Sequence, residues 1–265
     1  MKRTRTLGVM DGDQNIQKFK MKIIVFGDIH GRDIWKKVLD ERIDEVDRVI
    51  FLGDYFTSRE GISEYKQNLN FLEIIKYKER YPDKITLLRG NHDMEALKYE
   101  WADCYPYYEG FWVNDNAELF LSNTQWLVQI DNMVFSHAGI TQRWWTDMQK
   151  LYPQLQKFED VNQIEPSYMF GFRSFKFSDY HGDTPTQPLT WVRPACLCEH
   201  GYPDITYIVG HTTQNSIINY KENMLNLYGD DMIEYAICDV WCCDTLPREY
   251  LLIDDGEFIP VKIEM

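Results

Sequence analysis

Blocks of consecutive apolar residues, separated by polar stretches, begin shortly after residue 20. The first block, 23–26, is apolar at every position, which is the pattern of a strand covered on both faces. The next segment, 32–46, places its apolar residues on one side of a helix. These residues are Trp35, Val38, Leu39, Ile43 and Val46. The pattern therefore predicts a buried strand followed by an amphipathic helix.

The same pattern continues along the chain. A second apolar run covers 49–52, and a helix is predicted over 63–80, ending before Pro82. A third apolar run covers 85–88. Each run gives way at its carboxyl end to glycine and polar residues. Because α/β proteins bind their ligands at this edge of the sheet, the three loops are candidates for a functional site.

Short strand patterns dominate the second half of the chain, at 126–130, 133–136, 205–209, 216–220, 224–228, 250–253 and 258–263. A βαβαβ start with a strand-rich end predicts an α/β fold of two mixed β-sheets. We expect these sheets to pack as a sandwich flanked by helices, in four layers ordered α/β/β/α. Residues 1–20 are expected to be a flexible tail. Residues 21–265 are expected to form a single domain with insertions near 99–116 and 165–193.

Composition narrows the classes of function. The 265 residues are 44% apolar, enough for a substantial core, and the net charge of −14 argues against a nucleic-acid-binding groove. No stretch reaches the roughly 20 apolar residues of a membrane span, and the first residues lack the apolar core of a secretory signal. We therefore predict a cytoplasmic protein with reduced, buried cysteines. The alternative, a zinc site joining Cys196 and Cys198 to Cys242 and Cys243, lacks the usual ligand spacing.

Residues able to bind metals recur where the apolar runs end. Asp28 and His30 follow the first run, and by themselves they could be a polar turn or the first ligands of a metal ion. Four of the six histidines stand at such strand ends, with two aspartates and an asparagine, and this recurrence favours the metal. The predicted ligands are Asp28, His30, Asp54, Asn91, His137 and His211.

Six ligand side chains are too many for one open catalytic ion, and they fit two ions that share a bridging carboxylate. We predict Asp54 as the bridge, with Asp28 and His30 on one ion and the asparagine and the last two histidines on the other. Carboxylate, imidazole and amide-oxygen ligands suit transition metals better than Ca²⁺. The predicted cofactor is two divalent metal ions, Mn²⁺ first, with Fe and Zn²⁺ as alternatives.

Five short motifs resemble those of a known family. They are Gly-Asp-Ile-His-Gly at 27–31, Gly-Asp-Tyr at 53–55, Gly-Asn-His-Asp at 90–93, Ser-His-Ala-Gly at 136–139 and Gly-His-Thr at 210–212. In this order they resemble the calcineurin-like metallophosphoesterases. Thr213 stands where many members carry a second histidine, which looks more like the phosphoprotein-phosphatase branch. The resemblance implies a β-sandwich flanked by helices, a two-metal centre and hydrolysis of phosphate esters.

The expected chemistry is in-line attack on phosphorus by a hydroxide that bridges the two metals. The leaving oxygen needs a proton, and His92 is the predicted general acid; the alternatives are a third ligand or a structural contact. Arg193, in Thr-Trp-Val-Arg-Pro, resembles the phosphate-binding arginine of bacterial and phage-like phosphatases. Arg59 is a second phosphate-binding candidate or else a surface arginine. Relatives carry Gly-Asp-x-x-Asp-Arg-Gly in the second motif, whereas here Thr57 replaces the aspartate that partners the acid histidine.

Three functions remain open at this stage. The first is a phosphatase acting on phosphoproteins or small phosphate esters. The second is a dinucleoside polyphosphate hydrolase of the diadenosine tetraphosphatase type. The third is a non-catalytic scaffold, against which the complete ligand set argues. The aromatic residues of the first insertion either pack that loop or form a platform for a nucleobase or peptide; the platform candidates are Tyr105, Tyr107, Tyr108 and Trp112.

Overall fold

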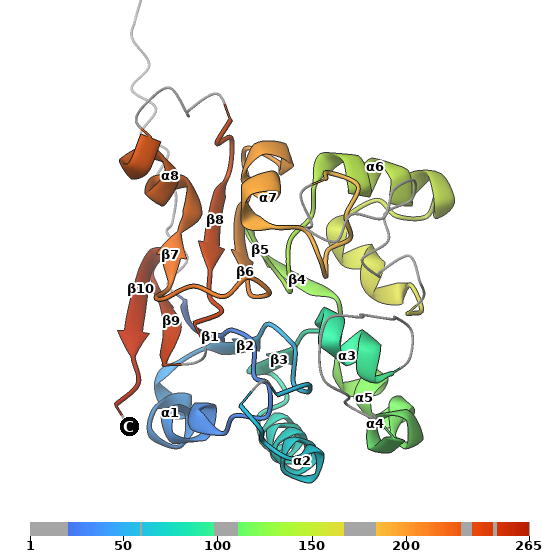
Figure 1. Cartoon of the computed structure of the whole chain (residues 1–265), viewed down its shortest axis with the longest axis vertical. Helices are drawn as coiled ribbons and strands as arrows, with labels where there is room; N and C mark the ends of the chain where they lie inside the picture. The colour runs from blue at the N-terminus through green and yellow to red at the C-terminus, as the bar shows by residue number, and fades with distance from the viewer. Residues whose placement is uncertain are drawn as a thin grey trace, which may run out of the picture.

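Two five-stranded mixed sheets form the centre of the computed structural model (Figure 1). The structure describes residues 21–58, 60–97, 111–166, 184–228, 235–245 and 248–264. The first sheet has the order β10-β9-β1-β2-β3, with β1, β2 and β3 parallel and β9 and β10 antiparallel. Its strands are β1 (Lys22–Phe26), β2 (Arg48–Phe51), β3 (Ile85–Leu87), β9 (Glu249–Asp254) and β10 (Glu257–Lys262).

The second sheet has the order β4-β5-β6-β8-β7. Strands β5, β6 and β8 run parallel to one another, and β4 and β7 pair antiparallel at the two edges. The strands are β4 (Leu127–Ile130), β5 (Met133–Ser136), β6 (Thr206–Val209), β7 (Ile218–Asn219) and β8 (Asp239–Cys242). Each sheet therefore contains three adjacent parallel strands, so the carboxyl ends of these strands share one edge.

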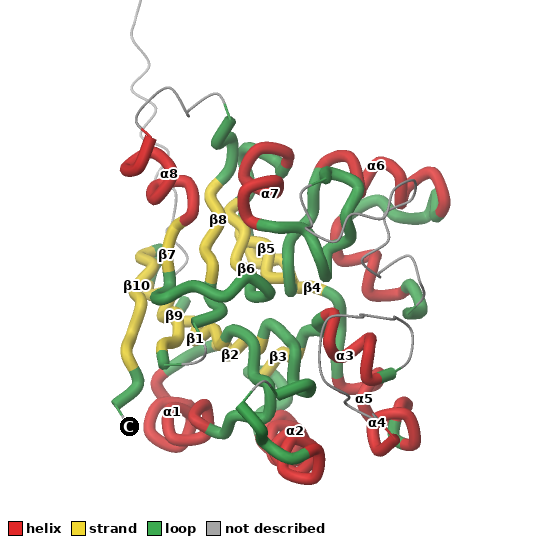
Figure 2. Tube along the Cα trace, in the orientation of Figure 1, coloured by secondary structure: helices red, strands yellow, loops and turns green. Residues whose placement is uncertain are grey.

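Helices cover the outer faces of both sheets, with the strands enclosed between them (Figure 2). Helices α1 (Ile34–Arg42) and α2 (Glu64–Arg80) lie outside the first sheet, and α6 (Gln142–Leu151) and α7 (Pro194–His200) lie outside the second (Figure 1). The remaining helices are η1 (Ile43–Glu45), α3 (Asn91–Ala96), α4 (Phe111–Asp115), α5 (Ala117–Asn123), η2 (Phe158–Gln163) and α8 (Tyr220–Tyr228). This arrangement confirms the predicted α/β sandwich flanked by helices.

Alternate residues of β1 face the two sides of the first sheet, which explains its continuous apolar run. Ile23 and Val25 join a core with Phe135 of the second sheet, and this core lies between the sheets. Ile24 and Phe26 join the larger core, which includes residues of the covering helices. These four residues of β1 are all buried. A strand buried on both faces needs apolar residues at every position, as the sequence has.

One predicted strand is wrong. The segment Met224–Tyr228 belongs to helix α8, not to a strand. A short apolar run has the same appearance in a buried strand and in a helix. The start signal lies upstream, where Asn219 accepts a hydrogen bond from the backbone N–H of Glu222 at 3.2 Å. An Asn with a Glu three residues later is the pattern of a capping box, and it marks the beginning of this helix.

Strand β8 has no counterpart among the predicted strands. Its burial alternates, with Val240 and Cys242 buried and Asp239 and Trp241 partly exposed. The sequence does not show this alternation, because Trp241 is apolar although it is partly exposed. The predicted strand 216–220 is shorter in the structure, where β7 covers only Ile218–Asn219.

Several predictions fall outside the described residues. They concern the tail 1–20, Arg59, Cys104, most of the two insertions and the platform candidates Tyr105, Tyr107 and Tyr108. Trp112, the fourth platform candidate, is described, and it packs against the larger core from α4. The other cysteines, Cys196, Cys198, Cys238, Cys242 and Cys243, are buried free thiols, as predicted.

Candidate metal centre

The strand ends of both sheets bring the predicted ligands to one place. Asp28 and His30 follow β1, and Asp54 follows the neighbouring strand β2. Asn91 begins α3 directly after β3, which pairs with β2. The last two ligands follow the paired strands β5 and β6 of the second sheet. Because these strands are parallel within each sheet, their carboxyl ends meet at one edge.

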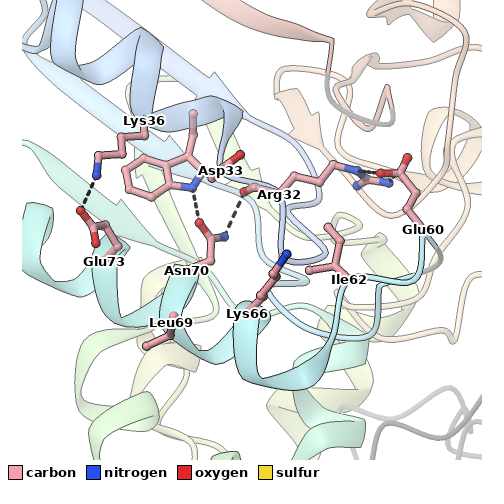
Figure 3. A pocket seen from close by; sticks show the side chains of 11 residues that line it. Arg32, Asp33, Lys36, Glu60, Ile62, Lys66, Leu69, Asn70 and Glu73 are labelled. Atoms are coloured by element: carbon pink, nitrogen blue, oxygen red, sulfur yellow. Dashed lines mark hydrogen bonds and ion pairs between the residues drawn. The ribbon is translucent and has the colours of Figure 1, made fainter.

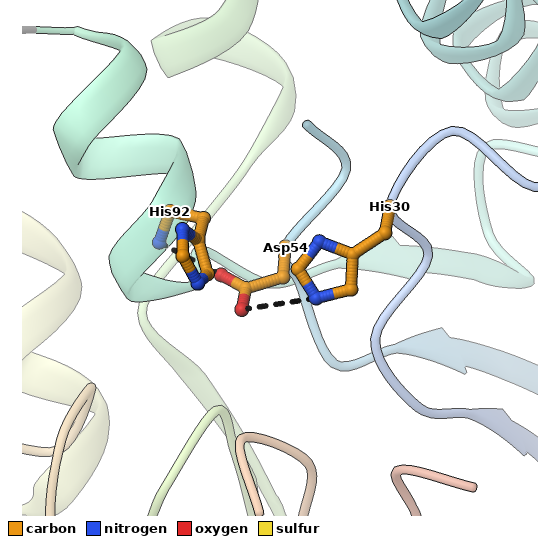
Figure 4. Close-up of side chains that lie close together, drawn as sticks. All are labelled: His30, Asp54 and His92. Atoms are coloured by element: carbon orange, nitrogen blue, oxygen red, sulfur yellow. Dashed lines mark hydrogen bonds and ion pairs between the residues drawn. The ribbon is translucent and has the colours of Figure 1, made fainter. Parts of the chain in front are cut away.

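The first half of the centre consists of Asp28, His30 and Asp54. Nε2 of His30 lies 3.9 Å from Oδ2 of Asp28 and 3.8 Å from Oδ2 of Asp54. Figure 4 shows the ring of His30 pointing at the Asp54 carboxylate, with His92 on the opposite side. All three residues are buried. A nitrogen and two carboxylate oxygens thus face a common point.

The second half of the centre consists of Asn91, His137 and His211. Oδ1 of Asn91 lies 2.9 Å from Nε2 of His137 and 2.9 Å from Nδ1 of His211. Nε2 of His137 also lies 3.4 Å from Oδ2 of Asp54. Asp54 therefore stands between the two halves, as its predicted bridging role requires. Separations of about 3 Å are those of neighbouring ligands around one ion with bonds of roughly 2.1 Å.

Backbone N–H groups hold the two carboxylates in place. Oδ1 of Asp54 accepts from the backbone N–H of His92 at 2.9 Å, and Oδ1 of Asp28 accepts from that of His211 at 2.9 Å. A Cβ on Gly90 would lie 2.1 Å from Oδ1 of Asp54, and one on Gly210 would lie 2.2 Å from Oδ1 of Asp28. These two motif glycines are thus required because the carboxylates pack directly against them. The Oδ2 atoms stay turned toward the histidine nitrogens.

Three residues of the centre adopt left-handed backbone conformations, which residues other than glycine rarely adopt. The φ angles are +45° at His30, +52° at Asp54 and +61° at His211. Such conformations cost on the order of 1–3 kcal/mol each and persist where the surrounding structure enforces them. Their concentration here is typical of a functional site.

Burial and close charges shift the pKa values of the first half. Burial lowers the pKa of His30 to about 3 although Asp54 opposes the change. Burial raises the pKa of Asp54, but the imidazoles of His137, His92 and His30 outweigh it and hold that pKa below its usual range. Burial and the charge of Asp244 raise the pKa of Asp28. At neutral pH, His30 is therefore a neutral imidazole beside the Asp54 carboxylate.

The pKa values of the two histidines in the second half shift in opposite directions. Burial lowers the pKa of His137, but the carboxylates of Asp54 and Asp28 outweigh it and raise that pKa to about 10. Burial and the charge of Arg193 lower the pKa of His211 well below its usual value. In the absence of another cation, a proton on His137 thus balances the surrounding carboxylates.

The donor atoms fit divalent metal ions. Nδ1 of His30 is 2.8 Å from the carbonyl oxygen of Phe56, and Nδ1 of His137 is 2.9 Å from that of Leu52. Since a carbonyl only accepts, each Nδ1 donates and each Nε2 is left to face oxygen acceptors. Only a proton or a metal ion satisfies such a cluster of acceptors. Backbone carbonyls that orient imidazoles in this way are a usual second layer around bound metals.

The structure also shows where the predicted catalytic residues lie. His92 follows Asn91 on α3, and its ring lies edge-on to that of His30 with the centroids 5.2 Å apart. His30, Asp54 and His92 also form a group whose ligand atoms lie within 4.8 Å of one another, so the third-ligand alternative for His92 stays open. Arg193 donates to Oγ1 of Thr212 at 3.0 Å, next to His211.

Two residues near the centre have no role in the sequence predictions. The carboxylate of Asp93 accepts from the backbone N–H groups of Asp54, Tyr55 and Gly90 at 2.8–2.9 Å, which ties the second and third motif loops together. Oε2 of Glu95 lies 3.1 Å from Nδ1 of His92. The helix-capping pattern of Gly-Asn-His-Asp was a signal for Asp93. Glu95 lies outside every motif, and only the helical spacing of three residues connects it to His92.

A separate cavity of about 560 Å³ lies beside the first motif, between the start of α1 and α2 (Figure 3). Its lining begins at Gly31, directly after His30, and contains none of the predicted ligands. Four of its charged residues form two ion pairs, Arg32 with Glu60 at 3.1 Å and Lys36 with Glu73 at 2.6 Å. The first of these pairs joins Arg32, the residue after the first motif, to the loop that follows the second motif.

Comparisons with known proteins agree with this picture. The profile of the family described as calcineurin-like phosphoesterase matches residues 21–230. The catalytic subunit of serine/threonine-protein phosphatase 4 from Candida glabrata is 37% identical over 91 residues, which cover 32% of this chain and 26% of the relative. The subunit of the same name from Saccharomyces cerevisiae is 39% identical over 89 residues, covering 31% and 26%. These matches span about a quarter of the relatives' length.

A solved structure shares the fold. It is a serine/threonine phosphatase from Saccharomyces cerevisiae with similarity to human PP5, with a TM-score of 0.52 and 16% sequence identity. The match covers 95% of this chain and 82% of that one. Because the family profile matches most of the chain, the protein belongs to the calcineurin-like phosphoesterases, which confirms the predicted family. None of the described helices is long and apolar enough to cross a membrane.

Proposed function

We propose that this protein is a metal-dependent phosphatase that hydrolyses phosphate monoesters, in the manner of serine/threonine phosphoprotein phosphatases. The observation that carries the proposal is the convergence of the six predicted ligands, five of them around Asp54, from five strand ends of two sheets. The similarity to the phosphatase 4 catalytic subunits supports a phosphoprotein as the substrate. We also propose that residues 21–265 act as one domain, in the cytoplasm.

Asp28, His30 and Asp54 would hold one divalent ion, and Asp54 with Asn91, His137 and His211 would hold the other. Their mixture of carboxylate, imidazole and amide oxygen suits Mn²⁺ first, with Fe and Zn²⁺ as alternatives. When bound, such ions supply Lewis-acid chemistry, because they acidify water and draw charge from phosphate oxygens. The carboxylate–imidazole cluster, whose Nε2 atoms face oxygen acceptors, is the feature of this chain that supports the assignment.

Arg193 is proposed to bind the phosphate. Its guanidinium lies over the ring of Trp191 at 5.9 Å and donates to Thr212, which follows His211. These contacts hold the side chain beside the second half of the centre. A planar guanidinium matches two phosphate oxygens at once, so it favours a terminal dianionic phosphate over a diester. Arg59, outside the described residues, stays a second candidate.

His92 is proposed as the general acid. In the reaction, water adds to phosphorus, the bond from phosphorus to the leaving oxygen breaks, and its electron pair stays on that oxygen. His92 gives a proton to the leaving oxygen, so the products are an alcohol and inorganic phosphate. General acids of this kind contribute roughly 10²–10⁴ in rate, with the greatest benefit for poor leaving groups.

The test is a hydrolysis panel on metal-stripped protein to which Mn²⁺, Zn²⁺, Mg²⁺ or no metal is returned. The substrates are p-nitrophenyl phosphate, bis-p-nitrophenyl phosphate, a phosphoserine peptide and diadenosine tetraphosphate. We expect metal-dependent turnover of the two monoesters, with the phosphoserine peptide preferred. His92→Ala serves as the variant that keeps its metals but loses turnover of the peptide.

Other outcomes would replace the proposal by a defined alternative. Preferred hydrolysis of diadenosine tetraphosphate would indicate a dinucleoside polyphosphate hydrolase. Two bound ions without turnover of any substrate would indicate a non-catalytic scaffold. Loss of both metals in His92→Ala would show that His92 is a ligand and not the acid.

A further inference from the structure

The second motif lacks the residue that would orient His92. Thr57 stands where relatives carry the aspartate that partners the acid histidine. In the structure Thr57 is buried with a left-handed φ of +65°, and its hydroxyl has no hydrogen-bond partner within the described part of the chain. A threonine hydroxyl carries no charge, and this one makes no contact with His92 that could replace the carboxylate. Another residue must hold the ring if His92 transfers a proton.

Glu95 occupies that role from a different direction. It lies one helical turn beyond His92 on α3, and its Oε2 is 3.1 Å from Nδ1 of His92. The side chain of His92 is 7% exposed and that of Glu95 is 22% exposed, so the pair is largely shielded from solvent. The backbone N–H of His92 is fixed at the same time by Asp54. The backbone of His92 and one nitrogen of its ring are therefore both held by hydrogen bonds.

This contact determines which nitrogen of His92 serves the centre. An ionised carboxylate only accepts hydrogen bonds, so Nδ1 of His92 donates to Glu95. His92 offers the centre a ring nitrogen whose distance to the ligand atoms of His30 and Asp54 is within 4.8 Å. With Nδ1 bound to Glu95, we assign Nε2 as the nitrogen that serves the reacting groups. A carboxylate that fixes the tautomer and orientation of a catalytic imidazole has a large effect on rate in unrelated enzymes, because the wrong tautomer cannot transfer the proton.

We propose that Glu95 is the positioning residue for His92 and takes over the task of the missing second-motif aspartate. The inference rests on the proposed function, in which His92 is the general acid. Nε2–H gives its proton to the leaving oxygen as the bond from phosphorus to oxygen breaks. His92 ends neutral, with Nδ1–H still donating to Glu95. Glu95 touches neither substrate nor metal ligand in this scheme, and it acts through His92 alone.

The test compares Glu95→Gln with His92→Ala and with the double variant, using metal-loaded protein. Turnover is measured on a phosphoserine peptide, whose leaving oxygen needs a proton, and on p-nitrophenyl phosphate, whose leaving oxygen does not. We expect Glu95→Gln to lower kcat on the peptide by about 10–100-fold. We expect little change on p-nitrophenyl phosphate, in KM or in metal content. The double variant should be no slower than His92→Ala.

Glu45→Gln is the matched control, because Arg42 and Glu45 form an ion pair with the same spacing of three residues at 3.2 Å on an exposed helix end. It should leave both activities unchanged. A spectroscopic measurement adds a readout that does not depend on turnover. The imidazole ¹⁵N signals of the Zn²⁺-loaded wild type should show a protonated Nδ1 on His92. This signature should be lost in Glu95→Leu and kept in Glu95→Gln, whose amide oxygen can also accept from Nδ1–H.

Several results would overturn the inference. Equal losses on both substrates, or an additive loss in the double variant, would show that Glu95 only stabilises the fold. An unchanged ¹⁵N signature in Glu95→Leu would show the same. If His92→Ala is selectively impaired on the peptide and Glu95→Gln is not, the proposed function stands and this inference fails. If the wild type hydrolyses no phosphate ester, the proposed function fails first.

Discussion

The two halves of the centre are built differently, although they share Asp54. In the first half, Asp28 and His30 come from one loop after β1, and the nitrogen lies 3.8–3.9 Å from the carboxylate oxygens. In the second half, Asn91, His137 and one further histidine come from three strand ends in two sheets. Their ligand atoms lie 2.9 Å apart. The second half, whose ligands are farther apart in the sequence, thus has the shorter distances between ligand atoms.

This difference shows where the geometry of each half originates. Asp28 and His30 are two residues apart on one loop. Their relative position therefore depends on the local backbone structure of that loop. The second half depends on how the sheets pack, because Nδ1 of His137 in the second sheet donates to the carbonyl of Leu52 in the first. We therefore expect the first half to survive perturbations of sheet packing better than the second.

The largest effect is expected from Asp54→Asn, which removes the charge that the halves share. Activity should fall by at least about 10³-fold, because a neutral amide cannot stabilise both sites. The chain should stay folded, since the amide oxygen can still accept from the backbone N–H of His92. Activity and circular dichroism are measured side by side. Substantial remaining activity would show that Asp54 does not connect the halves.

Next in size are the matched variants His30→Ala and His137→Ala, one from each half. Each should lower the affinity for one metal ion by at least about 100-fold while the other ion still binds. His137→Ala should also reduce the thermal stability of the metal-free protein more, since it removes a buried contact between the sheets. Metal content by mass spectrometry and thermal melts distinguish them. Loss of both ions in both variants would mean that the halves do not act independently.

A smaller effect is expected from Arg193→Ala, at the edge of the second half. KM for a phosphomonoester should rise roughly 10–100-fold through loss of a charged hydrogen bond, and both metals should remain. Arg193→Lys should recover only part of the loss, because an ammonium lacks the planar pair of donors. Equal KM values in wild type and variant would exclude Arg193 from phosphate binding.

The smallest effect is a pH dependence of the metal-free protein. The pKa of His137 is raised to about 10 by the nearby carboxylates, after an opposing effect of burial. A raised pKa contributes stability that is complete below the unfolded value of roughly 6.5 and is lost as the pH rises toward about 10. The melting temperature should therefore fall by roughly 10 °C between pH 6.5 and 10.

Two comparisons check this pH effect. Bound Mn²⁺ should reduce the fall in melting temperature, because the ion replaces the proton between the carboxylates. His137→Gln should remove most of the dependence in metal-free protein. A pH profile identical in His137→Gln and wild type would assign the effect to other groups.

The elements that the sequence predicted best are those with unambiguous periodicity. The runs at 23–26, 49–52 and 85–88 and the helix at 63–80 agree with β1, β2, β3 and α2 to within a residue or two. The prediction failed at 224–228, where five residues are too few to separate a strand period from a helix period. It missed β8 because two of its residues are a cysteine and a partly exposed tryptophan.

The sequence alone determined which kinds of side chain are available and where each one leaves a strand. The five motifs therefore identified the family and the set of candidate ligands, because glycine and metal-binding residues follow buried runs at fixed positions. Asp54 was predicted as the bridge from the sequence, whereas only the tertiary structure attached Asp93 to the loops around Asp54 and brought Glu95 to His92. These contacts depend on distances between residues, and sheet pairing, close packing against glycine and the orientation of α3 determine those distances. The local sequence does not predict them.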